Sequence, residues 1–169
     1  MVPAIIPVMT ANPYGEDLGD RDPMQALADT PQQIRSLVDG WTDSEFERSY
    51  APGKWSARKI LAHLAQTELA LSTRARFALT GPNYQAQSFD QDRWMPLDEH
   101  VDARTALDTY TTLRRMNLAM WRNLSEEQRN RPFHHPDFGD LTVAWIAAQM
   151  AGHDIHHLKQ FRLITTGRG

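Results

Sequence analysis

Apolar residues recur at helical spacing in several segments of the chain, and proline, glycine and capping residues separate these segments. Pro23 directly follows Asp22, which predicts a helix start because proline in the first turn loses only a backbone donor that has no helical partner. We expect this first helix to end near Gly40. Residues 42–45 read Thr-Asp-Ser-Glu, a capping box that predicts a short helix.

The longest predicted helix covers residues 57–80. Ser56 is its expected N-cap, and a Gly-Pro pair follows its last residue. Its buried face is marked by Ile60, Leu64 and Leu71, which lie on one side of a helix.

Two further helical segments are predicted after a long connection. Residues 83–101 are polar, contain a proline and lack a period, which indicates a connection that crosses the bundle. The third long helix has apolar residues near helical spacing, namely Leu107, Tyr110, Leu113, Leu118, Trp121 and Leu124. A second capping box at residues 125–128 predicts a short continuation, and residues 131–140 are expected to form a loop. Thr142 then caps the last helix, which should run to about Ile164.

These elements predict an all-α fold, an antiparallel four-helix bundle with one long crossover connection. No run of alternating apolar and polar residues is long enough to predict a sheet. The length of 169 residues fits one domain, which we place at residues 22–166. Residues 1–21 carry prolines and glycines without a sustained period, so we expect an irregular N-terminal arm that lies on the domain or on a partner.

Charge and composition narrow the function classes. The 18 basic and 21 acidic residues are interleaved and give a formal charge of -3, so nucleic acid is not an expected partner. No window approaches the roughly eighteen uninterrupted apolar residues of a membrane helix, and the first residues lack a basic leader segment. We therefore expect a cytoplasmic protein without membrane partners. The chain has no cysteine, so a metal ion must bind to nitrogen and oxygen.

The last helix carries the pattern that points to chemistry. Its apolar stripe, continued from Met150 by steps of three and four, reaches His153, His157 and then Phe161. Histidines four residues apart are stacked at about 5–6 Å between their β-carbons, from which both rings can reach one ion. His63 lies about 60° from the centre of the buried face of its helix and can lean into the same interior. Three neutral imidazoles suit Zn, Ni, Fe or Cu and leave coordination positions open.

Other histidines are weaker candidates for metal ligands. Each member of the set could instead be an ordinary buried histidine with hydrogen-bonded nitrogens. His156 is three residues from His153 and could compete with His157, but it lies on a polar flank of the helix. His134, His135 and His100 occur in a loop and in the connection, where we expect them to be exposed to solvent. The core set is therefore His63, His153 and His157.

Two carboxylates could support such a site. Glu68 lies roughly 140° round the helix from His63, so it cannot easily share that ion and could serve a neighbouring helix. It is still the carboxylate that we would test first as a catalytic general base. Asp154 adjoins a proposed ligand and is interpreted either as a solvated carboxylate or as a group that orients an imidazole. Trp55 and Trp145 are interpreted as core aromatic residues beside helix starts.

Four segments together resemble a known family. They read YAPGKWS at residues 50–56, HLAQTE at 63–68, FGDLT at 138–142 and HDIHHLKQ at 153–160. In this combination the chain resembles the DinB-like (YfiT-like) superfamily of metal-dependent hydrolases over about residues 25–165. The resemblance implies an up-down four-helix bundle, often a homodimer, with a histidine triad on two helices that binds Zn or Ni. Matched residue by residue, this triad falls on His63, His153 and His157.

The resemblance also bears on the reaction, because the superfamily includes bacillithiol and mycothiol S-transferases. Three protein ligands with open positions indicate a catalytic rather than a structural metal site. A hydrolase or a thiol-S-transferase is therefore expected, with a small-molecule substrate that includes a low-molecular-weight thiol in the second case. The alternatives are a stress-response module that binds a metal and a small ligand without turnover, and a bundle that binds no metal.

Overall fold

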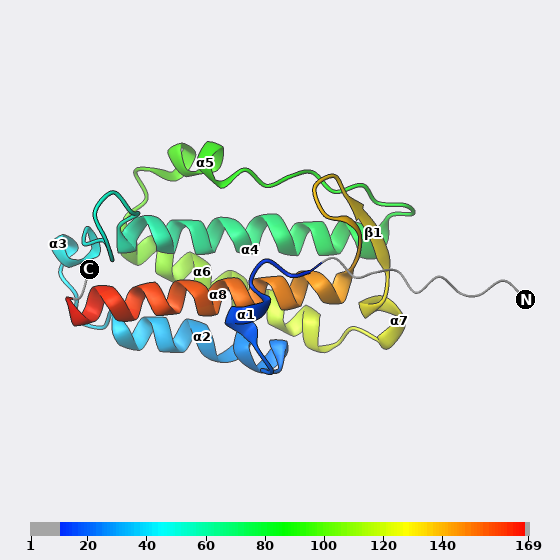
Figure 1. Ribbon diagram of the computed structural model, residues 1–169, viewed down its shortest axis with the longest axis horizontal. Helices are drawn as coiled ribbons and strands as arrows, with labels where there is room; N and C mark the ends of the chain where they lie inside the picture. Colours follow the sequence, from blue (N-terminus) through cyan, green and yellow to red (C-terminus); the bar gives the residue numbers. More distant parts are fainter. Residues whose placement is uncertain (1–10, 168–169) are drawn as a thin grey trace, which may run out of the picture.

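A computed structural model describes residues 11–167 and shows four long helices that pack side by side (Figure 1). They are α2 (Pro23–Leu37), α4 (Ala57–Thr80), α6 (Ala103–Arg122) and α8 (Val143–Thr166). Short helical segments precede or connect them, namely α1 (Gly15–Leu18) before α2, and then α3 (Asp43–Phe46), α5 (Gln91–Trp94), the 3-10 turn η1 (Met95–Asp98) and α7 (Glu126–Arg129). The expected all-α four-helix bundle is confirmed.

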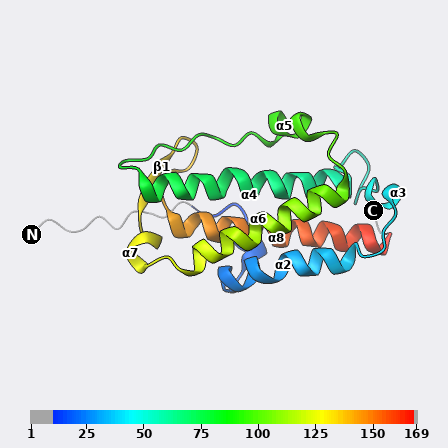
Figure 2. The same cartoon turned by 180° about the vertical axis from the view of Figure 1, so that it is seen from behind.

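The long crossover sets the directions of the helices. In both views α4 and α6 start at the end of the bundle where α3 lies, and α8 starts at the opposite end (Figures 1 and 2). The segment between α4 and α6 must therefore return along the bundle, and it contains α5 and η1. Each of α4 and α2 packs against both α6 and α8. This arrangement places α4 and α8, which carry the candidate histidines, side by side and antiparallel.

Capping residues fix the helix starts as the sequence indicated. The side chain of Asp22 accepts a hydrogen bond from the Gln25 amide at 2.7 Å at the start of α2. Ser56 and Thr142 do the same at the starts of α4 and α8. These bonds satisfy amide groups that lack helical partners. The first long helix ends at Leu37, shortly before the predicted Gly40.

The expectation of a loop at residues 131–140 and of no sheet is wrong. Strand β1 (Pro132–His135) pairs antiparallel with β2 (Gly139–Thr142) in a small hairpin. Phe133 and Leu141 are paired in this hairpin and are both buried against the bundle. Strands of four residues are too short to show an alternating pattern, which explains the incorrect prediction.

The start of the described chain packs on α8. The predicted arm covers residues 1–21, of which residues 1–10 lie outside the described part, and residues 11–21 include α1. The two segments approach closely at Gly152 of α8, where an added Cβ would overlap the carbonyl oxygen of Tyr14 and lie 2.8 Å from its Cβ. A glycine at this position allows the two backbones to meet.

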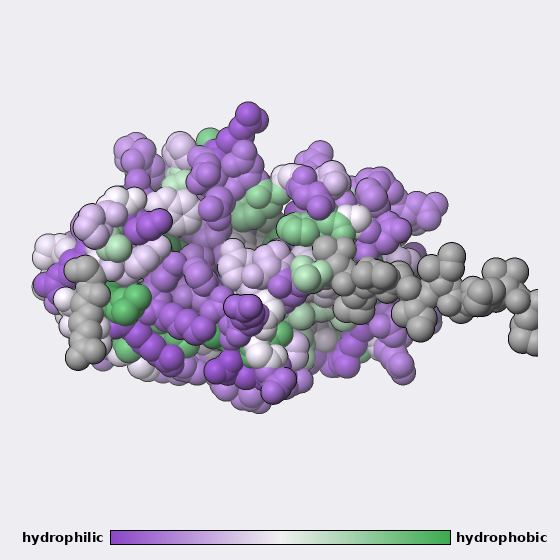
Figure 3. All heavy atoms as spheres, viewed as in Figure 1, coloured by the Kyte–Doolittle hydropathy of each residue, from purple (hydrophilic) through white to green (hydrophobic). Residues whose placement is uncertain are grey.

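Buried apolar side chains form two clusters, one toward each end of the bundle. One cluster includes Trp121, Ile146 and Met150, and the other includes Tyr110 and Phe161. Buried polar residues lie where the clusters meet on α4, α6 and α8, and they include the three candidate histidines. The surface in Figure 3 is largely hydrophilic, with a few apolar patches. None of the described helices is long and apolar enough to span a bilayer.

Candidate metal centre

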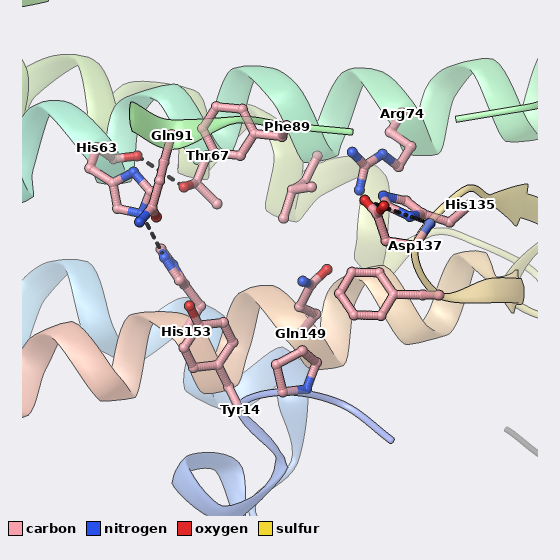
Figure 4. Close-up of a pocket in the computed structure, with 13 residues that line it drawn as sticks. Tyr14, His63, Thr67, Arg74, Phe89, Gln91, His135, Asp137, Gln149 and His153 are labelled. Atoms are coloured by element: carbon pink, nitrogen blue, oxygen red, sulfur yellow. Dashed lines mark hydrogen bonds and ion pairs between the residues drawn. The ribbon is translucent and has the colours of Figure 1, made fainter. Parts of the chain in front are cut away.

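Three imidazoles from two helices converge inside the bundle. The Nε2 atom of His153 lies 2.9 Å from Nε2 of His63 on α4 and 3.0 Å from Nε2 of His157, one turn further along α8. All three residues are buried, and their ligand nitrogens lie within 4.8 Å of one another. Figure 4 shows the rings of His63 and His153 pointing toward each other across the gap between the helices.

The donor set fits a divalent transition metal ion. Imidazole nitrogens bind such ions at about 2.0–2.1 Å, which puts two ligand nitrogens on one ion about 3.0–3.4 Å apart. The observed Nε2 separations are close to this range. In addition, the Nδ1 atoms of His63 and His153 are buried without a hydrogen-bond partner among the described residues. Rings with so few hydrogen bonds are costly to bury unless another group satisfies them.

The protein holds the imidazoles of His63 and His157 in the neutral form, which is the form that binds metal. Burial, together with the neighbouring His153, lowers the pKa of His63 to about 3, although the charge of Asp154 opposes the shift. Burial, His153 and His63 also hold the pKa of His157 well below its usual range. Both rings are therefore unprotonated at neutral pH.

A neighbouring side chain orients one of the two triad rings on α8, that of His157. Nδ1 of His157 lies 2.7 Å from Oε1 of Gln160. An amide oxygen only accepts, so Nδ1 carries the proton and the Nε2 lone pair faces the other two histidines. Nδ1 of His153 lies 3.9 Å from Oδ1 of Asp154, which is beyond hydrogen-bond distance.

Asp154 is buried, so its interpretation as a solvated carboxylate is wrong. Its Oδ2 accepts hydrogen bonds from the Tyr110 hydroxyl at 2.8 Å and from Nη1 of Arg114 at 2.6 Å. Burial raises the pKa of Asp154, but the Arg114 guanidinium and the neighbouring His153 together oppose this, and the net effect lowers the pKa. The carboxylate is therefore ionised beside the triad.

Glu68 belongs to the same buried network and not to the triad. Its carboxylate accepts from Nε and Nη2 of Arg114, and from the Asn117 amide at 2.8 Å. Burial raises the pKa of Glu68, and the charge of Arg114 opposes the rise. Both partners lie on α6, so Glu68 contacts a neighbouring helix, and its role as a general base stays a prediction.

The remaining histidines have other partners. Nδ1 of His156 lies 3.1 Å from Oδ2 of Asp17, so this ring contacts the segment of α1. His134 and His100 are exposed, as expected. His135 is the last residue of β1, and its side chain is buried. The expectation that it is exposed is wrong because the strand pairing was not foreseen.

A cavity of about 320 Å³ opens beside His63 and His153. Tyr14, Arg74, Phe89 and Gln149 line it, and none of the four was predicted as a site residue. Only Arg74 had a usable signal, because it follows His63, Thr67 and Leu71 on one face of α4 at steps of four, four and three. The other three residues reach the cavity from the segment before α1, from the crossover and from α8.

Known proteins resemble this chain in both sequence and structure. "Putative metal-dependent hydrolase OB0413" of Oceanobacillus iheyensis is 28% identical over 132 residues, which cover 78% of this chain and 76% of that protein. The solved structure of YfiT from Bacillus subtilis, described as a probable metal-dependent hydrolase, aligns with a TM-score of 0.78 at 25% identity, over 86% of this chain and 85% of that one.

A more distant structure shares the fold. Mycothiol-dependent maleylpyruvate isomerase aligns with a TM-score of 0.66 at 14% identity, over 88% of this chain and 60% of that one. The family model described as the DinB superfamily matches residues 26–161, which include all three histidines of the triad. The chain therefore belongs to the DinB superfamily.

Proposed function

We propose that the protein is a metal-dependent enzyme in which His63, His153 and His157 bind one divalent transition metal ion, Zn or Ni, and act on a small-molecule substrate. The observation that carries this proposal is the convergence of three buried Nε2 atoms beside a cavity. When bound, such an ion lowers the pKa of a coordinated water or thiol and so supplies a nucleophile near neutral pH.

The protein's own residues have three tasks in this proposal. Burial keeps the imidazoles of His63 and His157 neutral, and Gln160 sets the orientation of the His157 ring. Leu71 and Phe89 line the cavity with apolar surface that excludes water from a bound substrate. Burial, with the charge of Asp17, raises the pKa of Tyr14, so its hydroxyl stays protonated and available to donate a hydrogen bond in the cavity.

Two reactions are compatible with this site, hydrolysis and transfer to a thiol. The names of the curated relatives favour the first. A second cavity, of about 350 Å³, favours transfer to a thiol because it borders His157 and shares Tyr14 and Gln91 with the first cavity. Two small molecules could thus reach the triad from two sides, and the thiol must come with a substrate because the chain has no cysteine. A cytoplasmic location and a homodimer stay predictions.

Metal analysis tests the binding part of the proposal. Protein purified without chelator or nickel resin should contain about one Zn or Ni per chain. His153→Ala should lose it, whereas His156→Ala, on the same helix but directed at Asp17, should keep it. Equal metal content in the two variants would contradict the assignment of the triad.

Activity assays test the catalytic part. Metal-loaded protein should turn over a member of a panel of chromogenic esters, amides and electrophile-thiol pairs, and His153→Ala should not. Turnover that needs an added thiol identifies a transferase. Ligands that raise the melting temperature without any turnover would instead indicate the alternative, a non-catalytic binding module.

A further inference from the structure

A group of polar side chains lies at the end of the cavity far from the triad. Arg74 comes from α4, and His135 and Asp137 come from the hairpin. Figure 4 shows these three together on one side, with His63 and His153 on the other and Phe89 between them. None of the three is needed to hold the proposed metal ion.

The cavity is elongated along α4. His63, Thr67, Leu71 and Arg74 all line it, and their spacing places them on one face of the helix. Eleven residues separate the first from the last, a rise of about 16 Å at 1.5 Å per residue. An extended small molecule could therefore contact both ends.

Most N–H donors of the Arg74 guanidinium have no hydrogen-bond partner among the described residues. The residue is only 6% exposed, and one Nη2 hydrogen bond to the carbonyl oxygen of Gln87 at 2.7 Å is the only polar contact that the structure gives its guanidinium among residues 11–167. Guanidinium has five N–H donors and keeps its charge in proteins. A buried cation without an ion pair is costly unless an anion joins it.

His135 adds a second donor beside Arg74. Its Nδ1 accepts a hydrogen bond from the Asp137 amide at 3.1 Å, so the neutral ring carries its proton on Nε2. No hydrogen bond from Nε2 to a described residue occupies that donor. The Asp137 carboxylate accepts from the Ser88 hydroxyl at 2.6 Å and forms no ion pair with Arg74 within the described part of the chain.

We propose that Arg74 and His135 bind a carboxylate of the substrate, whose reactive group lies at the triad. The location of the reactive group rests on the proposed function, whereas the carboxylate site does not. The planar fork of arginine matches a carboxylate with two parallel hydrogen bonds. One guanidinium beside the negative charge of Asp137 fits a singly charged carboxylate better than a doubly charged phosphate.

The middle of the cavity carries an uncharged amide side chain. Oε1 of Gln149 is buried there without a hydrogen-bond partner among the described residues. This residue lies one turn before His153 on α8. Gln149 therefore places an amide group between the two ends of the cavity, and the carboxylate site does not require it.

Two matched probes test the carboxylate site. 8-Mercaptooctanoate and 8-mercaptooctan-1-ol differ only in the charged end, and calorimetry can measure their affinities for metal-free and metal-loaded protein. We expect the acid to bind about tenfold more tightly than the alcohol in both forms, because charge-assisted hydrogen bonds are the stronger ones. Metal loading should strengthen the binding of both thiols equally.

Arginine variants test whether Arg74 causes the preference for the acid over the alcohol. Arg74→Met should remove it, whereas Arg76→Met should keep it, because Arg76 lies on the same helix but donates to the Ser72 carbonyl. If the Met variant does not fold, Arg74→Gln keeps a polar side chain and should also lose the preference. Equal affinity of acid and alcohol for the wild-type protein would overturn the proposal, as would a preference that survives in either Arg74 variant.

The same titrations separate this proposal from the proposed function. A preference for the acid without any effect of metal would retain the carboxylate site and reject the metal-dependent enzyme. An effect of metal without a preference for the acid would retain the metal-dependent enzyme and reject the carboxylate site.

Discussion

His135 is a buried imidazole outside the triad, and its environment links stability to pH. Burial lowers its pKa, the charge of Arg74 lowers it further, and Asp137 opposes the shift. A histidine in an unfolded chain titrates near about 6.5. Below that pH the unfolded chain binds a proton that the folded protein does not, so folding becomes less favourable as the pH falls.

His135→Asn should remove this contribution, because Asn offers an acceptor for the Asp137 amide but does not titrate. The stability advantage of wild type over the variant should therefore shrink between about pH 7.5 and about pH 5.5. Urea unfolding of both proteins at the two pH values measures it. Because the other histidines are common to both, an advantage that stays constant with pH would show that His135 does not titrate abnormally.

Between elements, the buried network joins α4, α6 and α8 through Arg114. Removing its charge in Arg114→Met leaves the carboxylates of Glu68 and Asp154 buried without a counter-ion. Loss of one partner from a buried ion pair costs about 3–5 kcal/mol, which urea unfolding can measure. Arg35→Met is the matched control, since the Arg35–Asp108 pair is 43% and 68% exposed and should contribute about 0–1 kcal/mol. Similar losses in both variants would argue against a structural role for the network.

A second prediction at this scale concerns the contact between the Tyr14 backbone and α8. Gly152→Ala should displace this segment and destabilise the protein by about 1–3 kcal/mol, the usual cost of overpacking. Gly15→Ala is the control, because its added Cβ meets Asn12 at an ordinary 3.8 Å. Thermal unfolding compares the two. The close approach would be irrelevant to stability if the Gly152 variant melted no lower than the Gly15 variant.

The same elements show how far the sequence could predict the structure. Caps and periodic apolar residues are local signals, so the four long helices and the crossover were predicted correctly. The same periodicity predicted that His153 and His157 face the interior, and in the structure their rings lie beside the ring of His63. Metal binding itself stays a prediction. The hairpin and the exposure of His135 were predicted incorrectly because four-residue strands carry no period. Helical spacing indicates the face of α4 on which Arg74 lies, but its neighbours Gln87 and the hairpin come from other segments, so no local signal could reveal them.

At the scale of the whole molecule, a bound ion would connect distant parts of the chain. His63 and His153 are 90 residues apart in sequence. A ligand that binds only the folded state stabilises it by about 2.7 kcal/mol at a concentration of one hundred times its Kd. Zn or Ni at that excess should raise the melting temperature of the wild-type protein but not of His153→Ala. An equal rise in both proteins would indicate binding elsewhere.

The crossover between α4 and α6 carries Phe89 and Gln91, which help to enclose the cavity, yet its backbone runs along the outside of the four long helices (Figures 1 and 2). Connecting segments tolerate insertions and replacements better than packed helices do. Evolution could therefore exchange this segment and alter which compounds are admitted while the bundle stays intact. For protein engineers, a library confined to residues 83–91 is a practical place to seek new selectivity.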